Sequence, residues 1–90
     1  MRPNQAAGEQ STWIVQVGAF DQESEAKQRI SLARSKAAAL LKAAKSYTES
    51  TSKGDKTLYR ARFSGFDRTQ ADAVCKQLQR NDVSCIALRI

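Results

Sequence analysis

Two stretches of the chain share one alternation of large apolar residues with smaller or polar ones. The first, WIVQVGAFD, covers residues 13–21, and the second, YRARFSGFD, covers residues 59–67. In each stretch the period of two predicts a β-strand, and a glycine interrupts it. Phe-Asp then leads into a polar segment whose apolar residues recur at helical spacing. The chain therefore divides into two strand-turn-helix halves.

The first half is predicted to hold a strand over residues 12–18 and a long helix. Asp21 is a good N-cap residue, and an apolar stripe runs from Ala26 to Ala44. A helix that continues to Ala44 would be about 35 Å long, whereas a seven-residue strand is only about 23 Å long. We therefore expect the helix to overhang the sheet or to break near Ser35.

The second half is predicted to contain three more strands and a second helix. The strands are expected at residues 46–52, 57–64 and 83–89, with a turn at residues 53–56. The first of these strands, at residues 46–52, is polar and therefore suits the edge of a sheet. The helix begins at Asp67, with Gln70 as its capping-box partner, and ends at Asn81-Asp82. The polar residues 1–11 are predicted to be a disordered linker, and residues 12–90 to be the folded domain.

The element order βαββαβ predicts an α+β fold of the RNP-like (ferredoxin-like) type. Such a chain forms a four-stranded antiparallel sheet with two helices on one face. Strand alternation directs one set of side chains toward the helices: Trp13, Val15, Val17, Tyr59, Ala61, Phe63, Val83 and Cys85. The second set is left on an open face: Ile14, Gln16, Leu58, Arg60, Arg62, Ser84, Ile86 and Leu88.

The open face combines apolar residues, one amide and two arginines. Arg60 and Arg62 belong there because two unpaired guanidiniums would be costly to bury. This mixture suits a ligand with flat apolar faces, hydroxyl or amide groups and some negative charge. The alternative is a solvated sheet with scattered apolar residues, which is common on protein surfaces.

Composition narrows the classes of function. The net charge of +6 suits an anionic partner, although it also serves solubility. The chain has no histidine, which excludes Ser-His-Asp and Cys-His catalysis and histidine-based zinc sites. We expect neither enzyme activity nor a metal or cofactor in this domain. No run of 18 apolar residues occurs, so we expect no membrane insertion. No secretory signal follows Met1, and we expect the sequence to be a piece of a longer chain.

The two strand motifs and the final strand VSCIAL together resemble the SPOR (sporulation-related repeat) domain family. Members typically read W-x-V-Q-φ-G-S/A-F and then Y-R-V-x-φ-G-P-F, where φ is apolar. The resemblance covers residues 12–90 and implies a non-catalytic module that binds peptidoglycan strands stripped of their stem peptides. It also implies a place in the bacterial periplasm or cell envelope, at the division septum. The chain is similar in particular to the C-terminal module of some penicillin-binding D-alanyl-D-alanine carboxypeptidases, whose catalytic domain would precede Met1.

The resemblance, together with the predicted open face, identifies seven candidate glycan-binding residues. They are Ile14, Gln16, Ala19, Leu58, Arg60, Arg62 and Ile86. Gln16 matches the glutamine of the family motif, whereas Ala19 stands where many members have serine. Removal of the stem peptide exposes the lactyl carboxylate of N-acetylmuramic acid, and Arg60 or Arg62 could bind it through charge-assisted hydrogen bonds.

The pairing of Cys75 and Cys85 is left open by the sequence. Both side chains are predicted to point into the helix-sheet core, and a periplasmic location permits a disulfide. Packed layers lie about 10 Å apart, while bridged Cα atoms lie within about 7 Å of each other. A disulfide therefore requires the second helix to approach the last strand.

Two further functions compete with glycan binding. The alanine-rich first helix could dock a protein partner of the cell envelope. RNA binding on an RRM-like sheet is less favoured, because Tyr59 and Phe63 are predicted to face the core and the RNP1 pattern is not matched. We expect a monomeric domain that does not bind nucleic acid.

Overall fold

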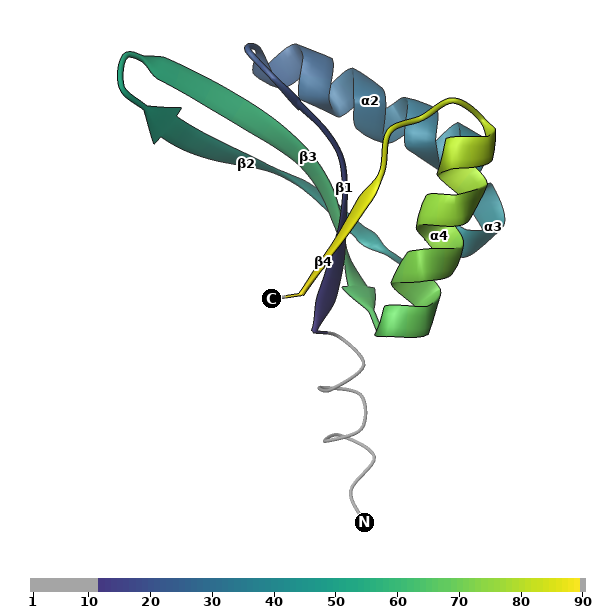
Figure 1. The fold of residues 1–90 in the computed structure, drawn as a ribbon. Helices are drawn as coiled ribbons and strands as arrows, with labels where there is room; N and C mark the ends of the chain where they lie inside the picture. Colours follow the sequence, from purple (N-terminus) through teal and green to yellow (C-terminus); the bar gives the residue numbers. More distant parts are fainter. Residues whose placement is uncertain (1–11, 90) are drawn as a thin grey trace.

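Four strands form one antiparallel sheet in the computed structural model, which describes residues 12–89 (Figure 1). The strands are β1 (Trp13–Phe20), β2 (Lys45–Lys53), β3 (Lys56–Phe66) and β4 (Ile86–Arg89), in the spatial order β2-β3-β1-β4. The helices are α2 (Glu23–Lys36), the short α3 (Ala38–Leu41) and α4 (Arg68–Arg80). The predicted α+β fold and its βαββαβ order are confirmed. The linker predicted at residues 1–11 lies outside the described residues.

The core lies between the sheet and the helices α2 and α4, which pack on the same face (Figure 1). Phe63 of β3 is fully buried at its centre, as are Val15 and Val17 of β1. The helices contribute three alanines, which allow close approach, and three larger aliphatic residues: Ala26, Ala33, Ala71, Ile30, Val74 and Leu78. None of the helices in residues 12–89 covers the opposite face of the sheet, as the sequence predicted (Figure 1).

A β-bulge in β1 determines which residues of this strand face outward. The pairing of β1 with β3 shifts between Gln16 and Gly18, and Gly18 has φ 155°. A Cβ atom on Gly18 would lie 2.6 Å from the ring of Phe20, so a side chain would force that ring to move. Because of the bulge, Ala19 lies opposite Arg60 and on the same face as Gln16, although the two are three positions apart in the strand.

The long first helix breaks at Ala37, two residues beyond the expected position. Ala37 has φ −137°, and its N–H still donates to the carbonyl of Ala33. Arg34 holds the chain beyond the break, because its guanidinium donates to the carbonyl oxygens of Leu41 at 2.9 Å and Ala44 at 3.0 Å. The same guanidinium lies 5.3 Å from the centre of the Phe63 ring. The chain thus turns back over the sheet instead of overhanging it.

Three local predictions are wrong. Gln22, and not Asp21, is the N-cap of α2, and its side chain makes no capping hydrogen bond. Leu40 falls within the apolar stripe predicted from Ala26 to Ala44 but is 44% exposed, because the non-helical backbone at Ala37, with φ −137°, interrupts the periodicity of α2. The last strand begins at Ile86 and not at residue 83, because β4 pairs only with the part of β1 that precedes the bulge.

Helix α4 begins and ends as the sequence predicts. Asp67 accepts a hydrogen bond from the backbone N–H of Gln70 at 2.7 Å, and the Gln70 side chain accepts one from the N–H of Asp67 at 3.0 Å. These reciprocal bonds form the predicted capping box. After the helix, Asp82 adopts the left-handed conformation with φ 63°.

Cys75 and Cys85 form a disulfide, with their Cα atoms 5.1 Å apart. Helix α4 therefore comes closer to the segment before β4 than the usual distance between packed layers. The bond closes a short loop that carries the left-handed Asp82 and leads into the edge strand. It thereby ties β4, which has only four residues, to the helix layer.

Candidate functional site

The open face is the side of the sheet opposite α2 and α4, and the strand register arranges its side chains in rows. The central row crosses all four strands, from Tyr47 through Arg62 and Gln16 to Ile86. A neighbouring row contains Glu49, Arg60 and Ala19, and another contains Lys45, Ser64, Ile14 and Leu88. Leu58 lies opposite Thr51, one row beyond Arg60. All seven candidate residues from the sequence therefore share this face.

Arg62 is at the centre of the open face and already has two partners. Its Nε donates to Oε1 of Gln16 at 2.9 Å, and its Nη1 forms an ion pair with Glu49. The Arg62 side chain is only 14% exposed, whereas that of Glu49 is 49% exposed. Three strands are thus connected by one polar network, which holds Arg62 and Gln16 in fixed positions.

Arg60 differs from Arg62 although the two are only two residues apart. It lies between Ala19 and Glu49 in its row and is half-buried. No hydrogen bond or ion pair joins its side chain to any other residue in the range 12–89. Of the two arginines that the sequence places on this face, Arg60 is therefore the one whose guanidinium has no partner within residues 12–89 and can bind an external anion.

A hollow of about 500 Å³ lies on the open face beside this network. Ile14 contributes to its floor and is only 6% exposed, so this residue is buried although it lies on the open side. The other lining residues are Tyr47, Thr48, Glu49, Arg62, Leu88 and Arg89. The hollow thus combines apolar surface with an aromatic ring and charged groups. Such a mixture is typical of a binding site for a polar ligand with apolar faces.

Tyr47 and Glu49 are residues of the site that the sequence analysis did not identify. Both lie in the predicted edge strand, and Tyr47 is 36% exposed. The sequence did contain a signal for their position, namely the turn at residues 53–56. Gly54 and Asp55 form a two-residue hairpin turn there, in which Gly54 has φ 64°. A turn of this length places Tyr47 directly opposite Arg62.

The aromatic side chains of the two central strands, β1 and β3, lie on the helix side of the sheet. Phe63 is fully buried, and Tyr59 packs against the same core. This confirms that neither ring is displayed on the open face, where an RRM would stack bases. Within residues 12–89, no group of three or more His, Cys, Asp or Glu side chains is placed to hold a metal ion. No helix in that range is sufficiently long and apolar to cross a bilayer.

Comparison with known proteins gives consistent findings. The family model described as SPOR domain matches residues 9–89. The crystal structure of the RlpA SPOR domain from Pseudomonas aeruginosa is similar, with a TM-score of 0.71 and 16% identity over 87% of this chain and 99% of that one. The solution structure of the peptidoglycan binding domain of the B. subtilis cell wall lytic enzyme CwlC has a TM-score of 0.61 and 22% identity, over 84% and 85% of the two chains. A search of curated proteins found no match.

Proposed function

This chain belongs to the SPOR domain family, and from that premise we propose that it binds peptidoglycan through the open face of its sheet. The observation that carries the proposal is the Arg60 guanidinium, which has no ion pair within residues 12–89 and lies beside the Arg62 network. The similar CwlC domain is itself a peptidoglycan binding domain. The ligand is a glycan strand that lacks its stem peptides.

The preference for stripped strands follows from charge. An amidase that removes the stem peptide leaves a free lactyl carboxylate on each muramic acid. Arg60 binds this carboxylate through charge-assisted hydrogen bonds, and a guanidinium can use two of its N–H groups at once. An intact strand has an amide at the same place, which offers no negative charge to the arginine.

The sugar rings lie over the apolar part of the face. The Tyr47 ring and Leu88 line the hollow, Ile14 is part of its floor, and Ile86 is 56% exposed on the edge strand next to Gln16. The Gln16 oxygen already accepts from Arg62, so its amide nitrogen is the group that donates to an N-acetyl or hydroxyl oxygen. Ala19 and Leu58 complete the contact surface.

The domain acts as a targeting module and not as a catalyst. It concentrates a parent cell-wall enzyme in the cell envelope at division septa, where stripped strands arise. The parent is a penicillin-binding D-alanyl-D-alanine carboxypeptidase, as the likeness of the two strand motifs to such C-terminal modules supports. These finer assignments rest on the resemblance of residues 13–20 and 59–66 to the family motifs.

Co-sedimentation with purified sacculi, before and after amidase treatment, tests the proposal. We expect binding to increase after the stem peptides are removed and to resist competition by an RNA homopolymer. Equal binding to both preparations would contradict the preference for stripped strands. Absence of binding to either would contradict the function itself.

Single substitutions test the site. Arg60→Ala should weaken binding to stripped strands about 12- to 150-fold, since a hydrogen bond to a charged group contributes about 1.5–3 kcal/mol. Gln16→Ala should also weaken it. Arg68→Ala is the matched control, because Arg68 is an exposed arginine on the helix side of the domain. Unchanged binding by both open-face variants would exclude this face as the site.

A further inference from the structure

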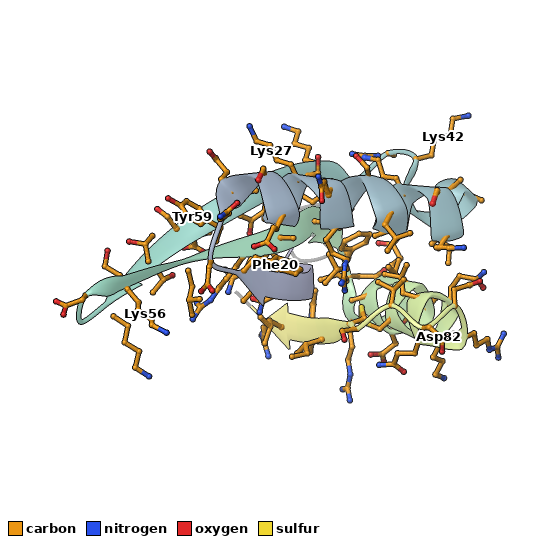
Figure 2. All side chains as sticks on the ribbon, turned by 90° about the horizontal axis from the view of Figure 1, so that it is seen from above. Phe20, Lys27, Lys42, Lys56, Tyr59 and Asp82 are labelled. Carbon is orange, nitrogen blue, oxygen red and sulfur yellow. A yellow bond between two sulfur atoms is a disulfide. The ribbon has the colours of Figure 1, made fainter. Side chains whose placement is uncertain are left out.

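The hairpin formed by β2 and β3 extends beyond the rest of the sheet. The last pair between β1 and β3 joins Phe20 to Tyr59, and β3 continues past it toward the turn, paired only with β2 down to Lys53 and Lys56. Figure 2 shows Lys56 close to the tip of this hairpin, well beyond Phe20. The protruding part forms a two-stranded ribbon that prolongs the open face.

Lys53 and Lys56 lie on the same side of this ribbon as Arg60. The register between β2 and β3 is uninterrupted from one end to the other, so every second residue keeps its side. Arg60, Leu58 and Lys56 therefore follow one another on the open side, and Lys53 lies directly opposite Lys56. From Arg60 to Lys56 the strand covers about 13 Å.

The two lysines make an unfavourable pair in the free domain. Like charges directly opposite each other in a hairpin destabilise it. Both side chains are exposed, and no ion pair joins either of them to another residue of the described range, including Asp55 in the turn between them. An anion placed between the two ammonium groups would relieve their repulsion.

We propose that Lys53 and Lys56 form a second anion subsite, which binds a further lactyl carboxylate of the glycan strand that lies on the open face. This rests on the proposed function and specifies its ligand. A single disaccharide occupies the face around Arg60 and the hollow, whereas a longer stripped strand continues along the ribbon. The domain thereby prefers long stripped strands to short fragments.

The test compares two ligands and two double variants of the 90-residue chain. The ligands are a single disaccharide with a free lactyl carboxylate and long strands prepared from amidase-treated sacculi. K53Q/K56Q removes the two charges of the subsite. K42Q/K76Q removes two charges from exposed lysines outside the open face and serves as the control. Dissociation constants are measured by calorimetry at low and high salt.

We expect K53Q/K56Q to bind long strands about three- to tenfold more weakly than the unaltered chain and to bind the disaccharide equally well. The loss should diminish at high salt. The melting temperature should stay the same or rise, since a repulsive pair is removed, which distinguishes the binding role from damage to the hairpin. The control should bind both ligands as the unaltered chain does.

Three results would overturn the proposal. The subsite is wrong if K53Q/K56Q binds long strands as well as the control does. It is also wrong if the disaccharide and the long strands lose affinity equally, because the lysines would then act through general charge. If the unaltered chain binds neither ligand, the proposed function fails and the subsite fails with it. Failure of the first two kinds leaves glycan binding by Arg60 intact.

Discussion

Replacing Glu49 with glutamine should strengthen the binding of stripped glycan strands. The Glu49 carboxylate forms an ion pair with Arg62 and lies directly opposite Arg60 on the neighbouring strand. It therefore occupies a position where a ligand carboxylate would find two guanidiniums. Glu49→Gln removes this competing charge. Arg62 should stay in place, because its Nε still donates to Gln16 at 2.9 Å.

The expected gain in affinity follows from how exposed the ion pair between Arg62 and Glu49 is. Arg62 is 14% exposed and Glu49 is 49% exposed, so solvent screens much of their attraction. A pair of this kind contributes about 0.2–1 kcal/mol. If that interaction no longer has to be broken by the ligand, affinity should rise about 1.4- to fivefold. The same loss should lower the melting temperature by about 1–8 °C for a domain of this size.

Calorimetric titration with amidase-released strands measures the change, and it should shrink as salt is added. Asp72→Asn is the matched control, since it removes one negative charge from an exposed position on α4. It should leave affinity almost unchanged. Binding by Glu49→Gln that is equal to or weaker than that of the control, with the fold intact, would refute the idea that Glu49 competes with the ligand.

Three other predictions concern the fold and the site. Cys75→Ser combined with Cys85→Ser should cost about 3 kcal/mol and lower the melting temperature by about 12–24 °C in calorimetry; two free thiols in the unreduced native protein would contradict the disulfide. Tyr47→Ala should weaken glycan binding about two- to tenfold through loss of the aromatic contact, and unchanged affinity in the same titration would remove this ring from the site. Asp67→Ala should destabilise the domain by about 1 kcal/mol, because Gln70 loses its capping partner; an unaltered melting temperature would show that the capping box is dispensable.

The sequence predicted the features that depend on neighbours along the chain. Alternation in residues 13–17 and 59–63 assigned two central strands and their buried faces, because the period of a strand depends only on its own backbone. Asp67 and Gln70 are three residues apart, so their capping box could be read directly. The same locality explains why six of the seven candidate residues lie on the open face once the strands are assigned. Ala19 is the exception, because the bulge at Gly18 brings it to that face.

The sequence did not predict which side chains contact one another across different strands. The ion pair between Arg62 and Glu49 joins two strands, and Gln16 completes it from a third. Nothing in the spacing of these residues distinguishes Arg62, which is engaged, from Arg60, which is open. The burial of Ile14 on an otherwise exposed face likewise depends on its neighbours in β3 and β4.

The sequence by itself determined the order of elements, the two faces of the sheet and the ends of α4. Only the tertiary structure decided the break at Ala37, the disulfide and the partners of the two arginines. The physical reason is that propensity, capping and strand period act within a few residues. The break depends on a guanidinium that reaches from Arg34 to carbonyls farther along the chain and to the Phe63 ring, and the disulfide depends on a distance of 5.1 Å between α4 and the segment before β4. Such distances exist only once the helices have packed on the sheet.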